Sequence, residues 1–277
     1  MNLTDPFCLD NIKACATASQ LAYTQPTLTD PISGESVLIQ DLGDCTLIAF
    51  PGTHDLRDVL RDIDCLRITT VILGQPCAVH AGFNRTHNAL FKKISLAYSI
   101  KETVTIPPTV AVTPSPLNGE SAGVRGENTQ VASATPIFFT GHSKGAAVAR
   151  RCALALLEKN LPVAGLITFG EPRGGDARYA TICNRALAGG SLRITNAADP
   201  VPWLPAWLAG NRHCGPEGWL PPNPESSIRN PQLVLGPRLW LQLLLNSAEI
   251  FRAWHLKDLV PLADHHIDNY LRRIDAL

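Results

Sequence analysis

The sequence predicts an α/β fold in which helices flank a mostly parallel sheet. Short apolar runs, typical of buried strands, alternate along the chain with segments whose apolar residues have helical spacing. Turn-forming residues separate the two kinds of segment. The composition, with 45% hydrophobic and 17% charged residues among 277, is that of a globular chain with a dry interior.

The first part of the chain predicts helices and strands in alternation. Apolar positions within residues 8–23 predict an N-terminal helix, and residues 37–40 and 46–50 are predicted to be strands joined by a polar turn. Asp55 is suited to cap a helix that follows it, and Gly82 precedes another helix.

Residues 105–135 differ in character from the rest of the chain. Four prolines are followed by a run rich in Gly, Ser, Asn and Glu with little periodicity. We therefore expect a flexible insertion within a single domain that spans residues 1–277. The insertion leads into the N-terminal end of the next strand, which favours a peripheral loop over a lid at the opposite end of that strand.

The stretch 136–159, PIFFTGHSKGAAVARRCALALLEK, is the strongest signal in the chain. It reads as a buried strand, a tight G-x-S-x-G turn around Ser143 and an alanine-rich helix. A serine in this context is typical of a nucleophile elbow, where glycines at 141 and 145 permit close packing. The alternative is that Ser143 only caps the helix, but the flanking strand and helix favour a nucleophile.

A nucleophilic serine needs a base, and that base needs an acid to orient it. Two further predicted strands, at 165–169 and 192–195, end in loops that carry carboxylates. Asp199 is the candidate acid because it directly follows a buried strand; a turn-stabilising role is its alternative, and Asp176 is its competitor. The candidate bases are the histidines that follow it in sequence, namely His213, His255, His265 and His266.

Other classes of function are disfavoured by charge and composition. A formal net charge of +0 gives no electrostatic case for binding nucleic acid. The apolar tract 239–245 is far shorter than the roughly 20 residues that span a bilayer. The histidines lack the spacing of metal ligands, so we expect no metal and no cofactor.

The N-terminal residues MNLTDPFCLDNIK lack the apolar core of a secretory signal. We therefore expect a cytoplasmic location. The eight cysteines contain no CxxC pair, and in a chain that is not exported they are expected to be reduced core residues.

Six segments in order resemble the class 3 (fungal-type) lipase family of α/β-hydrolases. They are AFPGTHDLRDVL, VHAGF, TGHSKGAAVA, ITFGEPRGGD, RITNAADPVPWLP and DHHIDNYL, and the resemblance covers most of residues 10–275 outside the insertion. It implies an α/β-hydrolase fold with Ser143 as nucleophile and Asp199 as acid. The family's Asp-His followed by a tyrosine matches Asp264, His265 and Tyr270, which favours His265 over His266 as the base.

The resemblance also implies an oxyanion hole. Thr53, just after the glycine of the family's oxyanion turn, and Lys144 are expected to supply backbone N–H groups. Two residues depart from the family pattern. Pro51 stands where arginine is usual, so whatever that arginine anchors is missing or replaced. Lys144 stands where leucine is usual, which places a cation beside the nucleophile.

These residues together predict a serine carboxylic-ester hydrolase that cleaves acyl esters, with acylglycerols as the expected substrates. Phospholipase A1 and feruloyl-type esterase are alternatives, and a non-catalytic binding protein on the same scaffold is the alternative from another class. The expected partners are an ester or lipid substrate and, transiently, a lipid interface. The predicted substrate-binding residues are of two kinds. Leu56, Val59 and Leu60 lie on the helix predicted after Thr53, whose apolar face is suited to cover an apolar cleft. Trp203 and Leu204 are predicted to line an acyl groove, with core packing as their alternative.

Overall fold

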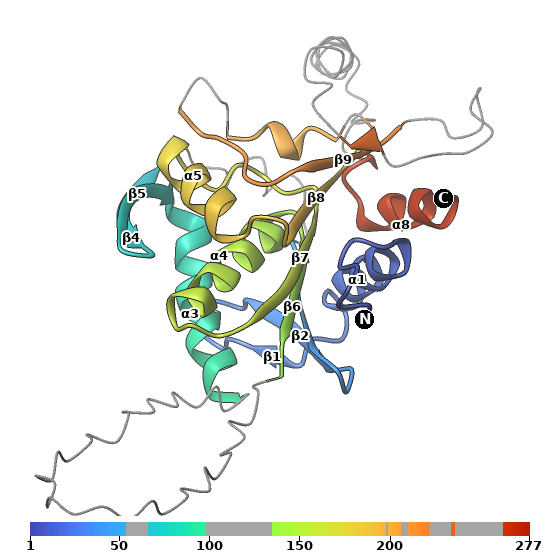
Figure 1. Ribbon diagram of the computed structural model, residues 1–277, viewed down its shortest axis with the longest axis horizontal. Helices are drawn as coiled ribbons and strands as arrows, with labels where there is room; N and C mark the ends of the chain where they lie inside the picture. The colour runs from blue at the N-terminus through green and yellow to red at the C-terminus, as the bar shows by residue number, and fades with distance from the viewer. Residues whose placement is uncertain (54–65, 98–134, 198, 206–209, 222–233, 236–262) are drawn as a thin grey trace, which may run out of the picture.

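The computed structural model describes residues 1–53, 66–97, 135–197, 199–205, 210–221, 234–235 and 263–277 (Figure 1). Within these residues the main sheet has the strand order β1-β2-β3-β6-β7-β8-β9-β10. Its strands are β1 (Leu28–Thr29), β2 (Ser36–Asp41), β3 (Thr46–Phe50), β6 (Ile137–His142), β7 (Val163–Phe169), β8 (Ser191–Asn196), β9 (Glu217–Leu220) and β10 (Val234–Leu235).

The centre of the sheet is parallel and its margins are antiparallel. Strands β3, β6, β7, β8 and β9 pair in parallel with one another in this order. Strands β1, β2 and β10 pair antiparallel at the two margins. The predicted mostly parallel sheet is therefore confirmed. The carboxyl ends of the parallel strands meet at one edge, which is where α/β folds place their sites.

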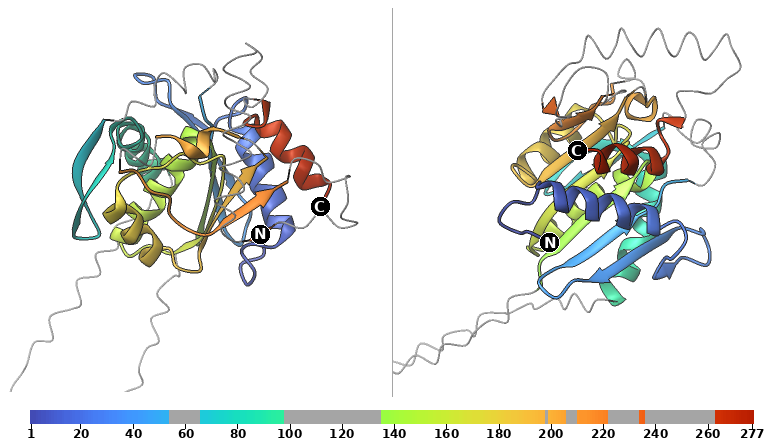
Figure 2. Two further views of the ribbon diagram at one scale, coloured as in Figure 1. Left: turned by 90° about the horizontal axis from the view of Figure 1, so that it is seen from above. Right: turned by 90° about the vertical axis from the view of Figure 1, so that its right-hand side faces the viewer.

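Two layers of helices cover the sheet (Figures 1 and 2). Helices α3 (Ala81–Ala97), α4 (Lys144–Glu158) and α5 (Ala177–Ala186) lie on one face. Helices α1 (Leu9–Leu21) and α8 (Ile267–Asp275) lie on the other face, so both chain termini are on that side.

Alternation of side chains along the strands produces one core on each face. In β6, Ile137 and Phe139 belong to the core beneath α3, α4 and α5, whereas Phe138 belongs to the core beneath α1 and α8. All six residues of β6 are buried, as expected for a central strand that is covered on both sides.

Sequence analysis did not predict the hairpin formed by β4 (Arg67–Ile72) and β5 (Gln75–His80). Its strands lie outside the main sheet, and most residues of β4 are exposed. The hairpin sequence therefore lacks the apolar run that identifies a buried strand.

The helices predicted near residues 8–23 and 82 are present as α1 and α3. The helix predicted after Asp55 and nearly all of the insertion at 105–135 lie outside the described residues.

His87 is a buried histidine on α3. Only 6% of its surface is exposed, and its ring stacks on Phe91 at a centroid distance of 5.2 Å. Burial, with a smaller contribution from the Arg151 guanidinium on α4, lowers the pKa of His87 to about 4. The folded protein therefore holds this imidazole neutral at pH values where an unfolded chain protonates it.

We predict that acid destabilises the fold partly through His87. Between pH 7 and pH 5 the unfolded chain takes up a proton at this residue and the folded protein does not, so the free energy of unfolding falls. For a pKa near 6.5 when unfolded and about 4 when folded, this residue accounts for about 2 kcal/mol of that fall. Denaturant titrations at pH 7 and pH 5 should show a loss smaller by that amount in His87→Gln. An equal loss in both proteins would contradict the assignment.

Candidate active site

Ser143 lies at a strained bend between β6 and α4. Its backbone has φ 57° and ψ −128°, a conformation that non-glycine residues seldom adopt. A Cβ added to Gly141 would lie 2.6 Å from the carbonyl oxygen of Gly145. A Cβ on Gly145 would lie 2.3 Å from the carbonyl oxygen of Pro51. Only glycine permits this close approach, which is the geometry of the predicted elbow.

Asp199 and His265 form a buried pair. The Nδ1 of His265 lies 2.8 Å from Oδ2 of Asp199, and neither side chain is more than 1% exposed. The Tyr270 hydroxyl donates to the same carboxylate oxygen at 2.6 Å, and the backbone N–H of Val201 donates to the other oxygen at 2.9 Å. Because the carboxylate can only accept, Nδ1 of His265 carries a proton, and in the neutral imidazole the lone pair is on Nε2.

The turn that carries His265 is held at the end of β8. Asn196, the last residue of that strand, donates its side-chain amide to the backbone oxygen of Asp264 at 2.8 Å. Arg273 of α8 donates to the side-chain oxygen of Asn196 at 2.6 Å and to the carboxylate of Asp264 at 3.0 Å. These contacts fix the backbone immediately before His265.

Ser143 and the Asp199–His265 pair share the segment at the end of β7. The N–H of Ser143 donates to the carbonyl oxygen of Phe169 at 2.9 Å. A Cβ on the next residue, Gly170, would lie 2.9 Å from both Asp199 Oδ2 and His265 Cε1. The Ser143 hydroxyl and Nε2 of His265 are both buried, and neither has a hydrogen-bond partner among the described residues.

His142 connects the nucleophile turn to the His265 backbone. Its Nε2 lies 2.7 Å from the carbonyl oxygen of His265, and the two rings are 4.6 Å apart. Burial and the neighbouring His265 hold the pKa of His142 well below its ordinary value, so the ring is neutral. The carbonyl can only accept, so Nε2 carries the proton and Nδ1 accepts from the Tyr23 hydroxyl at 2.7 Å.

Sequence analysis missed both Tyr23 and His142 as parts of the site. Burial raises the pKa of Tyr23, which keeps its hydroxyl protonated as a donor. Tyr23 follows helix α1, and its partner is 119 residues away in the sequence. The G-x-S-x-G pattern contains His142 at a position where any residue is accepted, so no local signal identified it.

The segment with Thr53 lies beside the nucleophile. A Cβ on Gly52 would lie 2.7 Å from Cβ of Ser143 and 2.5 Å from the Tyr23 hydroxyl. Lys144 is the first residue of α4, where backbone N–H groups have no partner within the helix. Its ammonium is bound by the Glu35 carboxylate at 2.7 Å, so the cation beside the nucleophile is paired with an anion.

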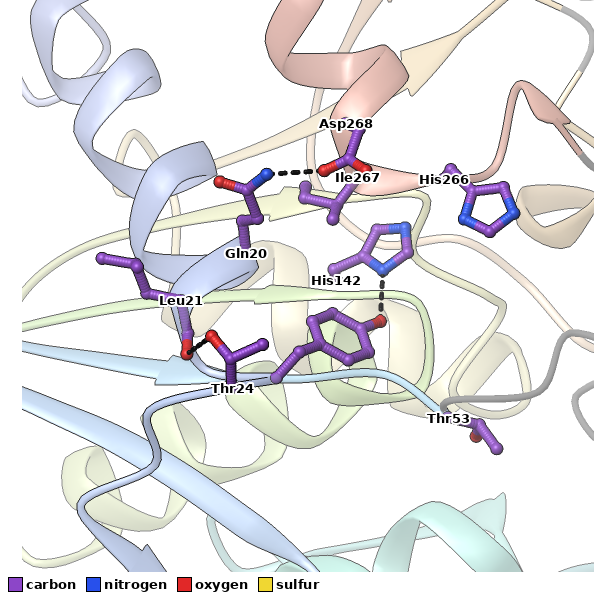
Figure 3. Close-up of a pocket in the computed structure, with 9 residues that line it drawn as sticks. Gln20, Leu21, Thr24, Thr53, His142, His266, Ile267 and Asp268 are labelled. Carbon is purple, nitrogen blue, oxygen red and sulfur yellow. Dashed lines mark hydrogen bonds between the residues drawn. The ribbon is translucent and has the colours of Figure 1, made fainter.

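A pocket of about 420 Å³ adjoins this region (Figure 3). It lies between the end of α1, the start of α8 and the Thr53 segment. Most of its lining side chains are polar; the lining residues are Gln20, Leu21, Tyr23, Thr24, Thr53, His142, His266, Ile267 and Asp268. His266, the exposed neighbour of His265, faces this pocket, whereas His265 is fully buried.

The predicted acyl contacts are only partly described. Leu56, Val59 and Leu60 lie outside the described residues. Trp203 and Leu204 are half-buried, and the Arg173 guanidinium lies over the Trp203 ring at 5.8 Å from its centroid. Neither residue lines the pocket beside Thr53.

A buried ion pair lies behind the nucleophile turn. Arg150 of α4 donates to both carboxylate oxygens of Glu171, at 2.6 and 2.7 Å, and the Thr168 hydroxyl also donates to Glu171 at 2.6 Å. Glu171 directly follows Gly170, so this pair anchors the segment between the nucleophile and the His265 ring. The pair was not predicted from the sequence, although arginine at 150 and 151 within an otherwise apolar stretch of α4 was a signal for it.

No group of three or more metal-ligating side chains occurs in the described part of the chain. In that part, no helix is both long and apolar enough to cross a bilayer.

Comparison with known proteins identifies related sequences. A family model described as lipase (class 3) matches residues 47–209. The secreted mono- and diacylglycerol lipase 1 of Fusarium solani is 36% identical over 107 residues, which are 38% of this chain and 32% of that protein. The secreted mono- and diacylglycerol lipase A of Penicillium cyclopium is 27% identical over 207 residues, 74% of this chain and 57% of that protein.

The chain thus spans between about a third and just over half of the length of these two relatives. Among solved structures, Rhizomucor miehei triacylglyceride lipase is similar with a TM-score of 0.54 and 20% identity, over 76% of this chain and 80% of that one. At this level of identity the structural similarity supports the α/β-hydrolase fold.

The prediction of a cytoplasmic location is wrong. The curated relatives from Fusarium and Penicillium are named as secreted lipases, which contradicts it. The prediction depended on the lack of an apolar leader among the first residues, and such a lack does not determine where a protein functions.

We predict that Gly170→Ala disrupts the Asp199–His265 pair. The added Cβ would collide with both side chains, and a displacement of catalytic groups by about 1 Å costs on the order of 100-fold in rate. Hydrolysis of a p-nitrophenyl ester should fall by at least that factor. Gly189→Ala is the matched control, because Gly189 also has a positive φ, +69°, but nothing within 4 Å. Equal activity in the two variants would contradict the prediction.

Proposed function

Because the chain belongs to the class 3 lipase family, we propose that it is a serine carboxylic-ester hydrolase that cleaves acylglycerols. The observation that carries the proposal is the buried Asp199–His265 pair beside a serine on a strained strand-to-helix bend. A hydroxyl, an imidazole lone pair and an orienting carboxylate are the three groups that acyl transfer by serine requires.

The proposed reaction has two steps. His265 Nε2 takes the proton of Ser143 as the serine oxygen attacks the ester carbonyl, and the resulting imidazolium then protonates the leaving alcohol. A water molecule, deprotonated by the same nitrogen, then releases the acid from Ser143. Asp199 holds the imidazole in the tautomer that this sequence needs and stabilises its positive charge.

The oxyanion is proposed to bind to the backbone N–H groups of Thr53 and Lys144. The close contact of Gly52 with Ser143 supports the role of Thr53, and the position of Lys144 at the start of α4 supports the second donor. Each such donor lowers the barrier by roughly 3 kcal/mol. The Lys144 ammonium itself is bound by Glu35, so only the backbone N–H of this residue is proposed as a donor.

The relatives named mono- and diacylglycerol lipases support acylglycerols over phospholipids or feruloyl esters as substrates. Their description as secreted likewise supports an extracellular location for this chain. Transient contact with a lipid interface would deliver such substrates. Trp203 and Leu204 remain predicted acyl contacts.

A non-catalytic binding protein is the competing proposal. The strained backbone of Ser143 and the buried Asp199–His265 pair argue against it, because backbone strain of this kind is concentrated at active sites. Covalent labelling of Ser143 by an organophosphonate separates the two proposals, since only an activated serine reacts.

We predict that Ser143→Ala abolishes the hydrolysis of monoacylglycerols and p-nitrophenyl esters. Loss of a nucleophile of this kind costs on the order of 10⁶ in turnover. The melting temperature should hardly change, because the Ser143 hydroxyl makes no hydrogen bond to the described part of the chain. Ser191→Ala, a buried serine at the opposite end of the parallel strands, is the control and should retain activity. Appreciable turnover by Ser143→Ala would remove the proposed function.

The adjacent histidines provide a separate test. His265→Ala removes the partner of Asp199 and should cost on the order of 10⁶ in turnover. His266→Ala removes an exposed side chain on the pocket wall and should leave turnover of p-nitrophenyl acetate nearly unchanged. The reverse result would assign the base to His266.

A further inference from the structure

Two cysteines from separate segments meet in the core. Cys183 is on α5, and Cys214 lies just before β9; both are thiols here, 1% and 3% exposed. Both belong to the core cluster on the face covered by α3, α4 and α5, and their side chains are close enough to interact. The next residues are also in contact, since the Gly215 N–H donates to the Asn184 side-chain oxygen at 2.6 Å. The two backbone segments are therefore held side by side where the thiols meet.

The surroundings determine when these thiols can react. Burial raises the pKa of the Cys183 thiol well above its ordinary value, although the nearby Arg150 guanidinium and the Tyr179 hydroxyl act in the opposite direction. A thiolate is the reactive form, and it is strongly disfavoured once the core has closed. Oxidation therefore takes place while the chain folds, before both sulfur atoms are shielded.

We propose that Cys183 and Cys214 form a disulfide bond when the chain folds in an oxidising compartment. The inference rests on the extracellular location included in the proposed function, because disulfides persist in such compartments. It replaces, for these two residues, the expectation that the cysteines remain reduced.

The chemistry is a thiol–disulfide exchange with a low-molecular-weight disulfide such as glutathione disulfide. One cysteine thiolate attacks that disulfide, forms a mixed disulfide and releases one glutathione thiolate. The second cysteine thiolate attacks the protein sulfur of the mixed disulfide and releases the other glutathione. Each protein thiol loses one proton, the protein loses two electrons, and glutathione disulfide is reduced to two thiols.

The bond would enclose the part of the chain that supplies the proposed acid. The loop of about 30 residues between the two cysteines includes β8 and Asp199, so the crosslink restricts this segment in the unfolded state. Helix α5 and the segment before β9 would be joined beside the Arg150–Glu171 ion pair. The crosslink would thus restrain the segment that carries Asp199 without contacting the reacting atoms.

The test is refolding of the full chain from its reduced, denatured state in a glutathione redox buffer. Peptide mapping without reductant should recover a Cys183–Cys214 crosslinked peptide, 2 Da lighter than the two thiol peptides. The melting temperature should be higher by about 10 °C in the oxidised protein than in the same protein after reduction.

Variants show whether this difference comes from the proposed pair. Cys183→Ala and Cys214→Ala should each abolish the difference between oxidised and reduced protein. Each variant is compared with itself, so the cavity left by the removed sulfur cancels. Cys152→Ala, which changes another fully buried helical cysteine, should retain the difference.

Quantitative alkylation of both cysteines in the refolded protein, after unfolding without reductant, would overturn the inference. So would a melting temperature that does not depend on reductant. The redox buffer sets the conditions, so neither result depends on where the protein functions in nature. Failure of the crosslink would leave the Ser143→Ala result intact, and failure of that result would leave the crosslink intact.

Discussion

The close approach of three backbone segments at the nucleophile turn constrains the rest of the site. Strand β6 ends and α4 begins at Ser143, and Gly145 packs against the carbonyl oxygens of Phe50 and Pro51 at the end of β3. This contact requires glycine, and it leaves the serine backbone in a conformation that a free chain would avoid. The surrounding cores of both faces maintain that strain. The same contact brings Gly52 and the Thr53 segment beside Ser143, so one packing constraint places both the nucleophile and the proposed oxyanion donor.

The positions of the histidine protons in the site follow from which neighbouring atoms can only accept a hydrogen bond. Asp199 and the His265 carbonyl are acceptors only, which assigns protons to Nδ1 of His265 and Nε2 of His142. Burial of His142 favours its neutral form, so no second cation lies against the His265 ring. This matters because the proposed reaction creates an imidazolium at His265. A charged His142 at this distance would oppose that step, whereas a neutral ring held by Tyr23 permits it.

The sequence was sufficient for features that depend on local pattern. The strand, glycine-flanked turn and helix around Ser143 are contiguous, and β7 and β8 are short segments bounded by turn-forming residues, so each was predicted directly. His265 and His266 are adjacent and chemically identical, and only a resemblance separated them. Burial distinguishes them in the structure, and burial depends on how α8 docks against the sheet. The roles of Tyr23 and Asn196 depend on partners far away in sequence, so no local pattern contains them.

The end of strand β8 positions both the proposed acid, Asp199, and the proposed base, His265. Asp199 lies three residues beyond Asn196, and the Asn196 side chain binds the backbone just before His265. Two segments from different parts of the chain therefore share a single anchor. Arg273 binds the same asparagine from α8, which couples the packing of the C-terminal helix to the geometry of the pair. Helix α1 contacts α8 through Gln20 and Asp268 at 2.5 Å, and α1 also leads to Tyr23. Helices near both ends of the chain thus support the site, because α1 and α8 each contribute to the contacts that hold His265.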